Sequence, residues 1–113
     1  MRGSITEKQI ETSILQYLTT RGIFCYKQNT VGIFDQARNC YRKPNSKYII
    51  SGIADIIGIY RSAFLAIEVK TPKRKNNLTI AQKNFIETVN HNGGIAFVAT
   101  SINDVVEQLD QAS

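Results

Sequence analysis

The sequence predicts an α/β fold in which helices flank one mixed β-sheet, and two observations lead to this fold class. Residues 53–60 and 63–69 are apolar and rich in β-branched side chains, and only two residues separate them, which is typical of an antiparallel hairpin. Residues 79–109 then show the pattern helix, strand, helix, and a strand–helix–strand connection pairs its strands in parallel through a right-handed crossover. The predicted order is α-β-β-β-α-β-α in a single domain of 113 residues.

The first predicted element is a helix over residues 5–20. Glu11 lies at the edge of its apolar surface, because Glu11, Leu15 and Leu18 follow one another at helical spacing. A solvated carboxylate is the ordinary interpretation of such a residue. Gly22 supplies the stop signal, and the apolar positions are Ile10, Ile14, Leu15, Tyr17 and Leu18.

Residues 23–27 are predicted to form a strand, and residues 28–47 a long, polar, basic loop or ragged hairpin. A connection of this length in a small domain is usually functional. Aromatic side chains are interspersed with basic ones here, which suits contacts with a DNA backbone and stacking on bases, although buried aromatic anchors are an equal alternative. These aromatic residues are Tyr26, Phe34, Tyr41 and Tyr48.

Two carboxylates interrupt the hairpin runs, and the predicted pairing places them opposite each other. With the turn at residues 61–62, the numbers of paired residues sum to 123, so Asp55 faces Glu68 across the strands. Lys70 lies on the same face because side chains alternate along a strand. Two such carboxylates between apolar neighbours need compensating positive charge, which Lys70 and a divalent metal ion would supply.

An alternative interpretation is that Glu68 and Lys70 form a solvated ion pair and Asp55 lies in a loop. The two residues at 61–62, Arg and Ser, are also not a favoured two-residue turn, and a loop of odd length would shift the alignment. The apolar residues on both faces favour a covered hairpin. They are Ile57, Ile59, Phe64 and Ala66 on the carboxylate face and Ala54, Ile56, Leu65, Ile67 and Val69 on the other.

The later part of the chain has clear start and stop signals. Thr79 and Gln82 have the spacing of a capping box that begins a helix, and the two glycines at 93–94 end it. His91, the only histidine, is expected at this helix end and not in catalysis. The other expected elements are a basic loop at 73–77 after Thr71-Pro72, a strand at 95–99, and a helix that Ser101 begins and whose Val105, Val106 and Leu109 point inward.

The net charge is +5, and basic residues flank the hairpin on both sides in the sequence. This distribution favours a polyanion such as nucleic acid, although a run of charges is more often a solvated surface. The basic residues expected to contact DNA are Lys27, Arg38, Arg42, Lys43, Lys73, Arg74 and Lys75.

Other features bound the class of protein. Cys25 and Cys40 lack the spacing of a metal site, and we expect reduced thiols without a functional role. No apolar run approaches the ~18 residues of a membrane span, so a cytoplasmic protein without a membrane partner is expected. Residues 1–4 fit a vector-derived leader and carry no weight in the fold prediction.

Several motifs resemble the VRR-NUC family of the PD-(D/E)XK nuclease superfamily, in particular its small stand-alone members associated with phages. The motifs are Gly52-Ile-Ala-Asp55, Ala66-Ile-Glu68-Val-Lys70-Thr-Pro72, Gln82-x-x-Phe85 and Gly93-Gly94-x-Ala96-x-Val98-Ala99. The similarity covers most of the chain, and it departs at Ala54, where the family commonly has proline. It implies a restriction-endonuclease-like core and a metal-dependent DNA endonuclease related to Holliday-junction resolvases.

In such an enzyme, Asp55 and Glu68, with the backbone carbonyl of Val69, are expected to hold one or two Mg²⁺ ions through hard oxygen ligands, and Mn²⁺ to substitute. The resemblance implies that Glu11 completes the metal site directly or through water. Glu7 is the weaker candidate for that position.

The resemblance also implies roles for two further side chains. Lys70 is expected to position the attacking water or to stabilise the phosphate. Gln82 would support the catalytic site by orienting Lys70 or a water, and this role competes with its capping role unless the side chain is shared.

The expected assembly is a homodimer that cuts four-way junctions, because two strands must be cut at symmetry-related positions. The surfaces expected at the dimer interface are residues 28–50 and the last helix. Three alternatives stay open: a DNA-binding module of the same fold without cleavage, a non-selective nicking enzyme, and a small interaction domain unrelated to nucleic acid.

Overall fold

The computed structural model describes residues 5–28, 33–42 and 47–112. The predicted order of helices and strands is present, with one short additional hairpin. In chain order the elements are α1 (Glu7–Thr20), β1 (Cys25–Lys27), β2 (Ile33–Asp35), β3 (Cys40–Arg42), β4 (Ile56–Tyr60), β5 (Ala63–Val69), the 3₁₀ helix η1 (Pro72–Arg74), α2 (Ile80–His91), β6 (Ile95–Ala99) and α3 (Ile102–Gln111).

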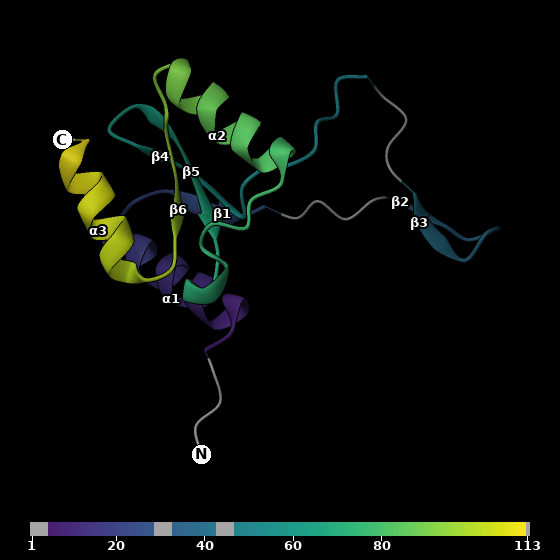
Figure 1. Ribbon diagram of the computed structural model, residues 1–113, viewed down its shortest axis with the longest axis horizontal. Helices are drawn as coiled ribbons and strands as arrows, with labels where there is room; N and C mark the ends of the chain where they lie inside the picture. The colour runs from purple at the N-terminus through teal and green to yellow at the C-terminus, as the bar shows by residue number, and fades with distance from the viewer. Residues whose placement is uncertain (1–4, 29–32, 43–46, 113) are drawn as a thin grey trace.

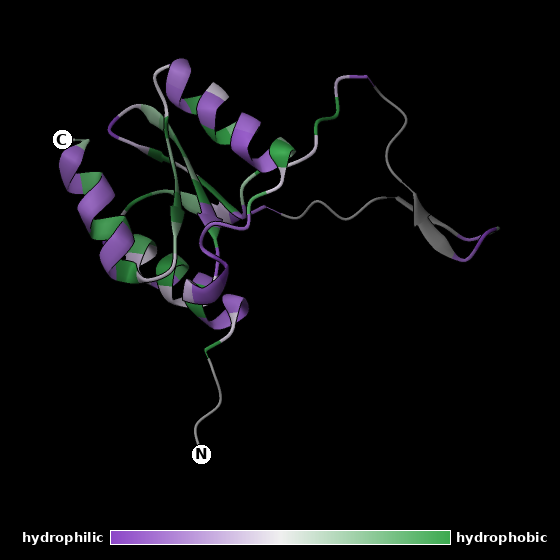
Figure 2. Cartoon of the chain, viewed as in Figure 1, coloured by the Kyte–Doolittle hydropathy of each residue, from purple (hydrophilic) through white to green (hydrophobic). Residues whose placement is uncertain are grey.

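Four strands form the central sheet in the order β1-β4-β5-β6. β4 pairs antiparallel with both β1 and β5, whereas β5 and β6 are parallel, so the predicted mixed sheet is confirmed. Helix α2 covers one face of the sheet, and α1 and α3 cover the other (Figure 1). All three helices alternate hydrophobic and hydrophilic residues along their length, as expected for helices with one buried side (Figure 2).

The segment predicted as a loop or ragged hairpin contains a hairpin, β2–β3, in which Phe34 pairs with Tyr41. This hairpin forms its own two-stranded sheet and lies apart from the central sheet (Figure 1). The backbone of Asn39, just before β3, has a positive φ of 51°, a conformation that asparagine tolerates better than most residues. The position of Lys43 lies outside the described residues.

The β4–β5 hairpin has the predicted register, with Ile56 opposite Ile67 and Tyr60 opposite Ala63. Arg61 and Ser62 form the two-residue turn and have φ values of 49° and 71°. Positive φ at both central positions is the geometry of a type I′ turn, whose twist matches that of the strands. The tertiary fold therefore holds an unfavourable turn sequence in the conformation that keeps Asp55 aligned with Glu68.

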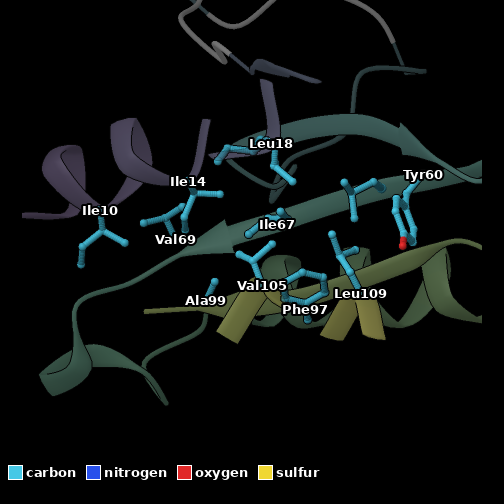
Figure 3. Close-up of a cluster of buried hydrophobic side chains, with 12 residues drawn as sticks. Ile10, Ile14, Leu18, Tyr60, Ile67, Val69, Phe97, Ala99, Val105 and Leu109 are labelled. Atoms are coloured by element: carbon cyan, nitrogen blue, oxygen red, sulfur yellow. The ribbon is translucent and has the colours of Figure 1, made fainter. Parts of the chain in front are cut away.

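The larger part of the core lies between the sheet and the pair α1 and α3. Ile10, Ile14 and Leu18 of α1 point toward Ile67 and Val69 of β5 (Figure 3). From the other side, α3 and β6 complete the cluster with Val105, Leu109, Phe97 and Ala99.

A smaller cluster lies under α2, where Ala54, Ile57, Ala66 and Ala96 meet Phe85, Ile86 and Val89. The sequence placed Ala54 on the opposite face, which is wrong because β4 begins at Ile56 and the strand alternation does not extend back to residue 54.

The expectation that the carboxylate face is covered along its whole length is also wrong. Ile59 and Phe64, near the hairpin turn, are 53% and 46% exposed. The reason is that α2 packs mainly against β5 and β6 and leaves this end of the hairpin open.

Local signals place the helix ends as predicted. Thr79 and Gln82 form the capping box of α2, Ser101 caps α3, and His91 is the exposed last residue of α2. The basic segment 73–77 differs from the prediction, because its beginning is the 3₁₀ helix η1, for which Pro72 provides a suitable first residue. Among the described residues, no helix has the length and apolar character needed to cross a membrane.

Candidate active site

The candidate site lies where β5 ends and β4 begins, and Asp55 is its first residue. Asp55 directly precedes β4, and its backbone carbonyl accepts a hydrogen bond of 2.7 Å from the N–H of Gln28. Its side-chain Oδ2 accepts a second hydrogen bond of 2.7 Å from the backbone N–H of Val69. Asp55 is therefore held on two sides, by its main chain at the end of β1 and by its side chain at β5.

Glu68 is the one charged residue buried among those described, with 4% of its surface exposed. The hairpin register, continued by one residue, places it opposite Asp55. Its Oε2 accepts a hydrogen bond of 3.1 Å from Nε2 of Gln82, and the Nζ of Lys70 lies 4.0 Å from the same oxygen. Lys70 is itself largely buried, since 14% of its side chain is exposed. The predicted meeting of the two carboxylates with Lys70 is present in the structure.

The pKa of Glu68 is raised from 4.5 to about 8, and burial is the largest cause. The charge of Asp55 and a side-chain hydrogen bond with it contribute to this rise, because the carboxylates repel each other unless one carries a proton. Lys70 acts in the opposite direction, and Glu7 of α1 adds a smaller upward contribution. In the metal-free protein at neutral pH, the carboxyl pair therefore holds a proton.

The Gln82 side chain is shared between the capping box and the candidate site, but its partner in the site is Glu68 and not the expected Lys70 or water. Its Oε1 accepts the backbone N–H of Thr79 at 2.9 Å, and this bond belongs to the capping box. Its Nε2 donates to Glu68 at the same time. Because an amide has a donor end and an acceptor end, one side chain can cap α2 and orient Glu68 together.

Gly52 fixes the position of the loop that leads to Asp55, a role that the sequence alone did not indicate. Its φ is +78°, and a Cβ atom built there would lie 2.4 Å from the carbonyl carbon of Ala81. Only glycine allows the loop to approach the first turn of α2 this closely. The feature of the sequence that could have indicated this role is the position of Gly52, three residues before the candidate metal ligand Asp55.

The residues fit a divalent metal ion of the magnesium type. The donors are carboxylate oxygens, which Mg²⁺ and Mn²⁺ prefer. The pKa of Glu68 is raised by burial and then by the charge of Asp55, and a bound cation would compensate the negative charge of both carboxylates. Asp55 and Glu68 would hold the ion, and the backbone carbonyl of Val69 is the third predicted ligand. Within the described ranges, no group of three or more His, Cys, Asp or Glu residues gathers at one place.

Glu11 lies differently from the expected arrangement. Its Oε1 is 3.2 Å from the Nζ of Lys27, and strand alternation assigns Lys27 to the face of the sheet that α1 covers. The carboxylate of α1 that contributes to the pKa of Glu68 is Glu7. The metal role of Glu11 stays a prediction.

The basic residues predicted to contact DNA occupy several parts of the structure. Lys73 and Arg74 are exposed in η1, and Lys75 follows it, so these three lie shortly after Lys70. Lys27 pairs with Glu11, and Arg38 is exposed in the turn between β2 and β3. Arg42 belongs to β3, but its side chain lies outside the described part of the structure, as does all of Lys43.

Comparisons with known proteins agree with this geometry. The chain is similar to a solved structure described as a VRR_NUC domain protein, with a TM-score of 0.63 and 22% sequence identity over 96% of this chain and 88% of the other. At this identity the likeness shows the fold. The family model described as "RecU: Recombination protein U" matches residues 1–107. A comparison with curated proteins gave no match.

The mixed sheet and flanking helices have the fold of the VRR_NUC structure, and together with the RecU match they confirm the predicted resemblance to a VRR-NUC, restriction-endonuclease-like nuclease. Because the match spans nearly its whole length, the chain belongs to the RecU family of Holliday-junction-resolvase-like nucleases.

Proposed function

We propose that this protein is a Mg²⁺-dependent endonuclease that cuts branched DNA, with four-way junctions preferred over linear duplex. The observation that carries the proposal is the buried carboxylate of Glu68, which faces the partly buried Asp55 and has Lys70 at 4.0 Å. A buried carboxylate beside a second like charge is costly to a fold, and a phosphodiester-cleaving metal site gives it a use.

Each residue of the site has a role in this reaction. Asp55 and Glu68 would hold the metal ion, which would lower the pKa of a bound water and neutralise charge that develops on the phosphate. Gln82 holds the Glu68 carboxylate in one orientation through its 3.1 Å hydrogen bond. The ammonium group of Lys70 is placed to hold the attacking water or a phosphate oxygen.

The proposed substrate and assembly rest on family membership and on exposed surface. The RecU family supports DNA as the partner and a junction as the substrate. A homodimer would present two cleavage sites in a two-fold arrangement, as a junction requires. Tyr48, Ile49 and Ile50 are 82%, 53% and 57% exposed and lie in the segment predicted for the interface. A cytoplasmic location follows from action on DNA.

Cleavage of labelled four-way junctions and linear duplexes of matched length tests the proposal. We expect Mg²⁺-dependent cutting that chelator abolishes, and loss of cutting in Glu68→Gln and Asp55→Asn without loss of DNA binding. The matched control is Glu107→Gln, which makes the same change at an exposed position of α3.

The outcomes separate the alternatives. Binding without cutting by the parent protein would leave a DNA-binding module, and equal rates on both substrates would leave a nicking enzyme. Sedimentation of a monomer at micromolar concentration would contradict the dimer.

A further inference from the structure

Two exposed aromatic side chains lie at the edge of the central sheet. Phe24 and Tyr26 are 63% and 46% exposed, and their ring centroids are 6.1 Å apart with planes inclined by 58°. They belong to the edge strand β1 and the residue before it. We refer to these two residues as the aromatic edge.

The aromatic edge lies on the same face of the sheet as the two carboxylates. Opposite residues of an antiparallel pair share a face, and Tyr26 pairs with Ile57 while the carbonyl of Phe24 accepts the N–H of Ile59. Ile57 pairs with Ala66, and Ala66 is two residues from Glu68 within β5, so the side chains of Ile57 and Glu68 point to one face. The aromatic edge therefore lies on the face of the sheet that carries Glu68, and β4 separates it from β5.

The helix that covers this face does not extend over the aromatic edge. α2 packs mainly against β5 and β6, and these two strands lie at the other end of the strand order from β1. Ile59, which lies next to the aromatic edge, is 53% exposed as well. Large apolar side chains that remain exposed beside a functional site usually mark a binding surface.

The size and chemistry of this surface favour a nucleobase over a second protein copy. Aromatic side chains present about 150–250 Å² each, so the exposed part of this cluster amounts to a few hundred Å². A stable protein interface needs about 800 Å² on each partner. Flat rings beside a site for DNA cleavage are, in contrast, of the right size and kind to stack on single bases.

We propose that Phe24 and Tyr26 stack on unpaired bases of the DNA strand next to the scissile phosphate. A base can reach the aromatic edge only when it has left the duplex, as at a branch point or in a flap. The aromatic edge would thus contribute to the choice of branched DNA over linear duplex. This inference rests on the proposed nuclease function.

The test uses two DNA probes that carry the same charge. Both are fluorescein-labelled duplexes with a short flap, which consists of thymidines in one probe and of abasic nucleotides in the other. Binding is measured by anisotropy with Asp55→Asn, which cannot cleave. We expect this protein to prefer the thymidine flap about 5- to 100-fold, the range that base–aromatic stacking provides.

The variants Phe24→Leu and Tyr26→Leu keep apolar bulk and remove the ring. Each should reduce the preference for the thymidine flap at least fivefold and leave binding to the abasic flap and its salt dependence unchanged. Tyr26→Phe, which keeps the ring, should retain the preference. Ile59→Ala, a similarly exposed aliphatic neighbour, should change it less than twofold.

Two results would overturn the inference. One is equal affinity of Asp55→Asn for both flaps, when the parent protein cleaves DNA. The other is loss of binding to both flaps together with a shift toward monomer in sedimentation, which would identify the aromatic edge as an interface between two copies. A chain that neither binds nor cleaves any probe would instead remove the proposed nuclease function itself.

Discussion

Raising the pH should destabilise the metal-free protein, because Glu68 carries a proton in the folded state that it releases on unfolding. Its pKa is about 8 in the folded protein and 4.5 for an ordinary glutamate. Between these two values the unfolded chain binds fewer protons than the folded one, so the free energy of unfolding falls as the pH rises. The free energy of unfolding does not depend on the titration of Glu68 at a pH well below the lower pKa or well above the higher pKa.

The size of the effect follows from the same two values. One proton per molecule corresponds to a slope of about 1.4 kcal/mol per pH unit. Over the whole interval the loss would reach about 5 kcal/mol as an upper limit. The total stability of a domain of this kind is about 5–15 kcal/mol, so the effect is a large share of it.

Urea denaturation in excess chelator, at a series of pH values from about 5.5 to about 7.5, measures this slope. Glu68→Gln is the matched variant, because the amide resembles the protonated carboxyl group and its oxygen can still accept from Gln82. The parent should lose stability with rising pH relative to this variant. In Asp55→Asn, which removes the neighbouring charge, the pKa of Glu68 in the folded protein should fall, so the loss should end at lower pH and be smaller in total.

Mg²⁺ should reverse the effect, since an ion bound to the ionised pair stabilises the folded state and releases about one proton at pH 7. Parallel pH profiles for the parent and Glu68→Gln in chelator would refute the reasoning, because the buried carboxyl would then not be the titrating group.

Three further predictions test the surroundings of the site. Gly52→Ala should cost several kcal/mol of stability and lower the cleavage rate, because its Cβ would lie 2.4 Å from the carbonyl carbon of Ala81. The control is Gly22→Ala, which has a similar φ but open space around it and should cost only about 1 kcal/mol. Equal decreases of the urea midpoint in the two variants would contradict this prediction. Lys70→Met should reduce the cleavage rate about 100-fold or more with little change in DNA binding, and a rate within a few-fold of the parent would exclude a role in the reaction. Neutralising residues 73–75 should weaken binding to all DNA alike and lower the salt slope by up to about 3, whereas an unchanged slope would place the DNA elsewhere.

Much of the site could be predicted from the sequence because it depends on local geometry. Strand alternation and a two-residue turn are sufficient to place Asp55 opposite Glu68 with Lys70 on the same face, and the structure has this register. The capping box at Thr79 and Gln82 is likewise a pattern within four residues. Such features follow from backbone periodicity, which a sequence displays directly.

Other features arise only when separate elements pack together. The bond from Gln82 to Glu68 exists because α2 lies over β5, and the approach of Gly52 to Ala81 depends on the same packing. Glu11 was expected at the metal site, but its partner in the structure is Lys27 on β1. Pairings of this kind cross between elements far apart in the chain, and no local pattern records them.

The chain's own pattern thus determined the class of fold, the register of the hairpin and the identity of the central carboxylates, because each depends on the order of apolar and polar residues along one or two neighbouring strands. The burial of Glu68, the shared use of the Gln82 side chain and the uncovered aromatic edge at Phe24 and Tyr26 depended on where each helix came to lie on the sheet. Helix position is set by the packing of whole surfaces, and many residues contribute to it at once.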